Sequence, residues 1–159
     1  MPALSPAEYT SIIQPLLDNT RAFAATPKNL ILHLYPRRLA TPVSQRKAIL
    51  SSLHASLKRD SKFWVTWSEY HEGFGILDEW LEAALARPGS PEAINGEGTT
   101  ELIMSTLNAL PWDVPSIKKF GRLVRNIKRV KENAKGRYST GPSMTLLLEQ
   151  QQQLTAMLL

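Results

Sequence analysis

The histidines are the first residues with types that could bind a metal. His71 and Glu72 begin the HExxH zinc-binding pattern, but Phe-Gly follows where that motif needs further helix and a second histidine. His33 and His54 lie far away in the sequence and add no metal-ligand spacing. We therefore expect surface or core histidines and no metal site.

A group of three carboxylates, Asp78, Glu79 and Glu82, is the next candidate for chemistry. General acid–base catalysis needs carboxyl groups in different environments across a cleft. Carboxylates spaced three and four residues apart on a helix instead favour one solvated face. Gly96–Gly98 is no phosphate loop, because no strand precedes it, and the chain has no cysteine to act as a nucleophile. We expect a protein that is not an enzyme and holds no cofactor.

The aromatic residues Phe63, Trp64, Trp67 and Tyr70 resemble a stacking platform, but their helical spacing favours a buried helix face. Trp112 differs, because it lies in a Leu-Pro-Trp-Asp-Val-Pro corner between helices. A ring in such a connection is expected to be half exposed and to line a groove.

Charge is segregated along the chain. The net charge is +5, yet residues Ile117–Arg137 hold nine Lys or Arg and one Glu, a local balance of +8, so the remainder carries −3. Between Asp60 and Asp113 ten carboxylates are matched by only Lys62 and Arg87. Such segregation bears on partners and association rates rather than on fold.

The basic stretch Ile117–Arg137 is the strongest functional signal, and its core is expected to form an amphipathic helix. Its basic residues are Arg122, Arg125, Lys128, Arg129 and Lys131, and its apolar stripe is Leu123, Val124, Ile127 and Val130. Like charges four residues apart cost a few tenths of a kcal/mol per pair. The alternative is a solvated helix that only keeps the protein soluble. A helix that retains so many repelling charges, however, favours an anionic partner.

The sequence patterns of the segments that carry these residues predict helices along the whole chain. The 159 residues, 43% of them hydrophobic, fit one all-α domain. Ser5–Glu8 is a capping box with proline at the first helical position, and Pro15 is expected to end or kink that helix. Thr26 and Thr41, each followed by proline, repeat the start signal.

Later in the chain, Asp60 is expected to cap an aromatic helix that Gly73 ends in the left-handed conformation. Arg87–Gly98 is expected to be a turn-rich loop without an element of its own. The remaining expected helices cover residues 76–86, 99–110 and 113–120, with a basic helix to about Ala134. No segment alternates like a strand.

The helical domain is expected to cover residues 1–138, and residues 139–159 a linker and a helix-prone tail rich in glutamine and leucine. The first residues show no signal peptide, and no apolar run reaches the roughly 18–20 residues of a membrane span. We expect a soluble intracellular protein.

Three motifs in sequence order resemble a known family. They are Leu77-Asp78-Glu79-Trp80-Leu81, the helix Leu102–Pro111 that ends in Leu-Pro, and Ile117–Arg129 with its Gly-Arg-Leu-Val-Arg core. This succession, within about residues 77–131, resembles the N-terminal domain of transcription elongation factor TFIIS. That module also occurs in elongin A, Mediator, LEDGF-type proteins and PNUTS. The family closes with a helix carrying a tryptophan, whereas Met144–Leu159 has none.

The resemblance implies a right-handed bundle of about five core helices, here with extra N-terminal helices and a C-terminal helical tail. It implies a nuclear scaffold of the transcription elongation machinery that binds short acidic-hydrophobic motifs of disordered proteins. From the spacing we infer the partner-binding residues: Trp112, Lys118, Lys119, Phe120, Arg122, Arg125, Lys128 and Arg129.

Two alternatives remain open. The basic helix could contact nucleic-acid phosphates. Base readout has little support, because Asn126 and Asn133 are the only amides expected on the polar face, so such binding to DNA or RNA would be non-specific. The Met144–Leu159 tail could mediate self-association.

Overall fold

The chain is helical wherever its structure is described. The computed structural model describes residues 2–19, 26–58, 61–87, 89–111 and 124–130, and these contain no strand. The all-α expectation is therefore confirmed. The elements are α1 (Pro6–Glu8), a π-helical turn η1 (Tyr9–Ile13), α2 (Gln14–Asp18), α3 (Thr26–Leu34), the 3₁₀ turn η2 (Tyr35–Arg37), α4 (Val43–Ser56), α5 (Lys62–Ser68), α6 (His71–Leu85), the 3₁₀ turn η3 (Pro91–Ala93) and α7 (Thr100–Ala109). Residues 124–130 form a further helical segment.

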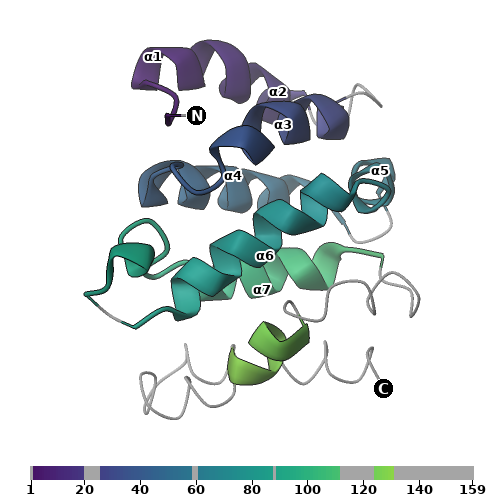
Figure 1. The fold of residues 1–159 in the computed structure, drawn as a ribbon. Helices are drawn as coiled ribbons and strands as arrows, with labels where there is room; N and C mark the ends of the chain where they lie inside the picture. Colours follow the sequence, from purple (N-terminus) through teal and green to yellow (C-terminus); the bar gives the residue numbers. More distant parts are fainter. Residues whose placement is uncertain (1, 20–25, 59–60, 88, 112–123, 131–159) are drawn as a thin grey trace.

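The longest of these helices, α6, runs through the middle of the molecule. It contacts α3 and α5 on one side and α7 on another, and α4 also packs against α7. Figure 1 shows α1, α2 and α3 at one end, and residues 124–130 beyond α7 at the other. The expected tail, residues 139–159, lies outside the described residues. The right-handed five-helix arrangement remains an inference from the resemblance.

The N-terminal capping box forms as predicted. The Glu8 N–H donates to Ser5 Oγ at 3.2 Å, and the Ser5 N–H donates to Glu8 Oε1 at 3.1 Å. Pro15 has no N–H for the next helical bond, and the chain widens into the π-helical turn η1 before it continues as α2. The helix does not end at Pro15 as expected, because the chain stays helical through Asp18, and the irregularity is the π-helical turn just before the proline.

The two Thr-Pro starts behave differently. Thr26 is the first residue of α3, as expected. At the second start, Pro42 is the N-cap residue of α4, and Thr41 does not cap it. The Thr41 hydroxyl donates instead to the carbonyl of Arg37 at 2.8 Å, so it stabilises the turn before α4.

Gly73 does not end the aromatic helix, and that prediction is wrong. Ser61 caps α5 by accepting from the Trp64 N–H at 3.3 Å, and the helix ends at Ser68. Gly73 lies inside α6 and has no positive φ. A Cβ there would lie 2.8 Å from Trp67 Nε1, so glycine is required for the close approach of α5 and α6. The expected cap Asp60 lies outside the described residues.

Three of the four aromatic residues predicted to form a buried helix face do so on α5, whereas Tyr70 lies beyond the end of this helix and is half-buried. Phe63, Trp64 and Trp67 are all buried, with Trp64 fully enclosed. The Phe63 ring meets Trp64 edge-on at 5.1 Å and stacks on Trp67 at 5.9 Å between centroids. Trp80 on α6 is also buried, which fixes α6 against the preceding helices.

The connection between α6 and α7 is turn-rich, as expected, with positive φ at Gly89 and Gly98. It nevertheless contains η3, which the sequence did not predict. Gly96 packs on α6, since a Cβ there would lie 2.5 Å from the backbone carbon of Ala83. The loop is thereby held on the side of α6. None of the described helices is long and apolar enough to cross a bilayer.

Candidate functional site

The basic helix is described over residues 124–130, where it carries three of the predicted partner-binding residues. Arg125, Lys128 and Arg129 are all exposed. The other predicted partner-binding residues lie outside the described residues: Trp112, Lys118, Lys119, Phe120 and Arg122.

The apolar stripe of this segment is buried, as the spacing predicts. Ile127 is fully enclosed and Val130 is 1% exposed, while Val124 is half-buried. Both fully buried side chains belong to the main hydrophobic core. Because the apolar side is held in the core, Arg125 and Lys128 are presented outward on a fixed helix.

Asn126 is not on the polar face of this helix, and that expectation is wrong. Its side chain is 1% exposed. Its Nδ2 donates to Oε2 of Glu82 on α6 at 2.6 Å, and its Oδ1 accepts from Arg129 Nη1 at 2.9 Å. Periodicity could not reveal this, because the partner carboxylate lies 44 residues earlier in the chain.

Arg129 joins the same network. Its Nη1 lies 3.9 Å from Glu82 Oε2, and its Nη2 donates to the carbonyl of Leu85 at 3.4 Å. The two charged side chains remain 44% and 43% exposed, so the ion pair itself contributes little, on the order of 0–1 kcal/mol. Two contacts with α6, to Glu82 and Leu85, and one with Asn126 on its own helix nonetheless hold the guanidinium in place. We expect Arg129 to position the basic helix more than to bind a partner.

The carboxylates of α6 therefore have unequal roles. Asp78, Glu79 and Glu82 are all partly exposed, and Glu82 faces the basic helix through Asn126 and Arg129. His71 and Glu72 are exposed at the start of α6. Among the described residues, no three histidines or carboxylates are placed to hold a metal ion.

A second polar centre, which the sequence did not single out, is Arg46 on α4. Its side chain is 1% exposed. Its Nε donates to Thr41 O at 2.7 Å, and its Nη2 donates to Arg38 O at 3.0 Å and Leu39 O at 3.3 Å. The guanidinium carbon lies 5.3 Å from the centre of the Trp80 ring. Arg46 thus ties the turn before α4 to α6.

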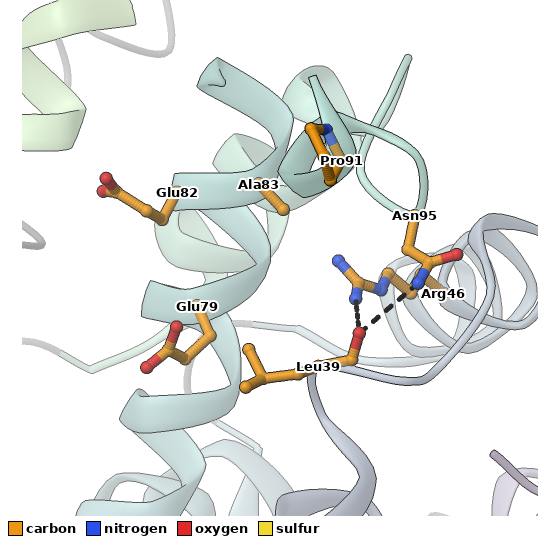
Figure 2. A pocket seen from close by; sticks show the side chains of 7 residues that line it. All are labelled: Leu39, Arg46, Glu79, Glu82, Ala83, Pro91 and Asn95. Carbon is orange, nitrogen blue, oxygen red and sulfur yellow. Dashed lines mark hydrogen bonds between the residues drawn. The ribbon is translucent and has the colours of Figure 1, made fainter. Parts of the chain in front are cut away.

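Arg46 also lines a pocket of about 320 Å³ between α4, α6 and the η3 loop. The residues around it are Leu39, Arg46, Glu79, Glu82, Ala83, Pro91 and Asn95. Figure 2 shows the Arg46 guanidinium and the Asn95 amide both reaching the Leu39 carbonyl. No sequence motif marks this pocket, because its walls come from three separate segments.

No protein-family model matches the chain, and no curated protein or solved structure matches it either. The resemblance to the TFIIS N-terminal domain therefore rests on the sequence motifs alone.

Proposed function

We propose that this chain is a non-enzymatic protein-interaction module that binds short acidic-hydrophobic segments of disordered partners on the basic helix. The observation that carries the proposal is the pair Arg125 and Lys128. Both side chains are exposed on a helical segment whose other side is buried in the core. Residues three apart lie on one helix face, so their charges reinforce each other toward a partner.

The attachment of the basic helix to α6 supports this proposal. Asn126 and Arg129 hold the segment on Glu82, so the positive face needs little ordering when a partner binds. Less ordering lowers the entropic cost of association. Complementary charge steers encounter and fixes register, while apolar anchors supply much of the affinity.

The resemblance extends the proposal to the partner and the compartment. It implies an adapter or scaffold of the nuclear transcription elongation machinery, whose partners are disordered nuclear proteins. The +8 balance of Ile117–Arg137 fits the acidic residues of such motifs.

A binding titration with charge-reversal variants tests the proposal. The full chain is titrated with acidic-hydrophobic peptides and with duplex DNA at two salt concentrations. We expect peptide binding that the double change Arg125→Glu and Lys128→Glu weakens by about tenfold or more. The matched control reverses two exposed lysines elsewhere, Lys28→Glu and Lys58→Glu, and should bind as the parent does.

Two outcomes would contradict the proposal. One is an equal loss of peptide affinity in the basic-helix double variant and in the control double variant, which would indicate an effect of net charge alone. The other is binding of DNA alone with a steep salt dependence, a slope of about −0.9 per neutralised phosphate. In that case the basic helix is a nucleic-acid contact instead.

A further inference from the structure

The pocket between α4, α6 and the η3 loop has apolar walls. Leu39, Ala83 and Pro91 form these walls, and the Leu39 side chain is 63% exposed at the mouth of the pocket. Arg46 lies behind them, because its side chain is 1% exposed and its guanidinium donates to backbone carbonyls. Among the described residues that line the pocket, none therefore offers a ligand an accessible positive charge, and the pocket favours an apolar group.

Two large apolar side chains that are exposed to solvent flank this pocket. Leu39 lines it, and Ile94, which is 68% exposed, lies in sequence between the lining residues Pro91 and Asn95. Exposed apolar surface that gathers at a pocket marks a place for a partner, whereas a single exposed side chain is ordinary. At about 30 Å³ for each water-sized group, the 320 Å³ of the pocket hold roughly ten non-hydrogen atoms. That is room for one leucine or phenylalanine side chain.

Glu82 connects this pocket to the basic helix. It lines the pocket, and its Oε2 accepts from Asn126 and lies 3.9 Å from Arg129 Nη1. Figure 2 shows the Glu82 carboxylate on the side of α6 away from Ala83. The pocket and the basic helix therefore lie on two sides of one residue of α6, and a single bound segment can contact both.

The charges on the two sides of Glu82 differ in sign. Arg125 and Lys128 present positive charge on the basic helix, whereas Glu79 and Glu82 place carboxylates at the pocket. An acidic residue of a partner is attracted to the first pair and disfavoured beside the second. Packed helices lie about 8–10 Å apart and an extended chain covers about 3.3–3.6 Å per residue, so about three neutral residues span the distance between the two subsites.

We propose that this pocket takes the apolar anchor of the same partner segment whose acidic residues contact the basic helix. The partner is then a disordered segment that carries one leucine or phenylalanine, about three neutral residues and an acidic run, in either chain direction. This inference rests on the function proposed for the basic helix and deepens it, because it names the apolar subsite and the order of residues in the ligand.

Fluorescence-labelled peptides titrated into the full chain test the pocket. The reference peptide carries a leucine, a neutral spacer of about three residues and an acidic run. Replacing its leucine by alanine should weaken binding by about tenfold, because less apolar surface is buried. Removing the spacer should weaken binding by about fivefold or more, because the acidic run then lies beside Glu79 and Glu82.

The test variant of the protein is Leu39→Glu, which replaces an apolar wall by a carboxylate at a side chain that is largely exposed and not part of the core. We expect it to bind the reference peptide about tenfold more weakly and to lose the preference for leucine over alanine. The matched control is Leu32→Glu on α3, because Leu32 is 60% exposed, does not line the pocket and undergoes the same change of charge. It should bind the peptide as the parent does.

The outcomes separate this inference from the function on which it rests. If the double change Arg125→Glu and Lys128→Glu weakens binding but Leu39→Glu does not, the basic helix binds the peptide and the pocket inference is overturned. An equal loss in Leu32→Glu and Leu39→Glu would also overturn it, as an effect of net charge. Binding of no peptide, or binding that the double variant leaves unchanged, would contradict the proposed function and this inference with it. Self-association of the free chain that Leu39→Glu abolishes, measured by analytical ultracentrifugation, would assign the pocket to a second copy instead.

Discussion

Asn126 donates a 2.6 Å hydrogen bond from Nδ2 to Oε2 of Glu82, and this contact fixes the basic helix to α6. The same asparagine accepts from Arg129 on its own helix. One buried amide therefore satisfies an acid and a base at once. The exposed charges of Arg125 and Lys128 are positioned by a neutral residue that makes no contact with solvent.

The first prediction concerns this amide. Asn126→Ala removes a buried donor and a buried acceptor, and we expect it to lower the free energy of unfolding by about 1–3 kcal/mol. Asn126→Asp should lower the free energy of unfolding further than Asn126→Ala at neutral pH, because it places a second carboxylate beside Glu82. Like charges raise the pKa of such a pair, so the deficit of this variant should shrink as the pH falls. Urea denaturation at several pH values measures both effects.

The control for added charge is Asn29→Asp, because Asn29 is exposed on α3. Its stability should stay within about 0.5 kcal/mol of the parent. If Asn126→Ala is equally neutral, the contact with Glu82 does not stabilise the attachment of the basic helix.

The second prediction concerns Gly73. Gly73 lies in the first turn of α6, and replacing a glycine inside a helix by alanine ordinarily stabilises by up to about 0.5–1 kcal/mol. Here the new Cβ would lie 2.8 Å from Trp67 Nε1, and the Trp67 ring cannot move easily because it is stacked on Phe63. Overpacking typically costs about 1–3 kcal/mol, so we expect Gly73→Ala to destabilise on balance. Thermal or urea unfolding measures the change.

Gly75 provides the comparison on the same helix. A Cβ there would lie 3.0 Å from the Tyr35 ring, which is only half-buried and can yield. Gly75→Ala should therefore cost less than Gly73→Ala. A Gly73→Ala variant as stable as the parent would show that the contact between α5 and α6 is not tight.

The third prediction concerns the pKa of Glu8. The Ser5 backbone N–H, with a smaller contribution from the Ser5 side chain, lowers this pKa below the usual 4.5. A carboxylate whose pKa is lowered by folding stabilises the fold above pH 4.5. That contribution is lost as the pH falls through the folded pKa. Side-chain NMR titration should therefore place the Glu8 midpoint below 4.5.

Two variants at Ser5 separate the causes. Ser5→Ala removes only the hydroxyl, whereas Ser5→Pro also removes the N–H and suits the φ of −65° at this residue. The Glu8 midpoint should rise in the order parent, Ser5→Ala, Ser5→Pro. Ser11→Ala is the control, because the Ser11 hydroxyl donates to the Glu8 carbonyl and not to its carboxylate. An unchanged midpoint in Ser5→Pro would exclude this origin of the shift.

What the sequence could predict follows from the range of the interactions. The Ser5–Glu8 capping box and the buried pair Trp64 and Trp67 depend on residues three or four apart, and both predictions are confirmed. The predicted left-handed role of Gly73 failed, because a contact with a neighbouring helix decides its place and a turn signal cannot show it.

In the candidate site, too, features set by short-range spacing could be predicted, and features set by distant contacts could not. The burial of Ile127 and Val130 was readable from helical spacing. The inward position of Asn126 was not, because a polar residue is placed inside only by its partner, here Glu82. The role of Arg46 was likewise invisible, since it depends on the carbonyls of an irregular turn and on Trp80, 34 residues later in the chain.

The fourth prediction weighs two opposite effects at Arg46. Arg46→Met removes a buried charge, which favours the variant, but it withdraws a donor from three carbonyls. Arg38 O keeps the indole N–H of Trp80 at 2.8 Å, whereas Thr41 O loses a 2.7 Å bond to a charged donor. Lost bonds to charged groups cost about 1.5–3 kcal/mol each, so we expect a net destabilisation of about 2–4 kcal/mol.

Lys47→Met is the matched control for Arg46→Met, because it removes a positive charge from the next residue, whose side chain is exposed. It should change the free energy of unfolding by less than about 0.5 kcal/mol. Arg46→Lys should also destabilise, because an ammonium cannot reproduce the planar fork that reaches Thr41 and Arg38 together. An Arg46→Met variant more stable than the parent would show that the buried charge outweighs its hydrogen bonds.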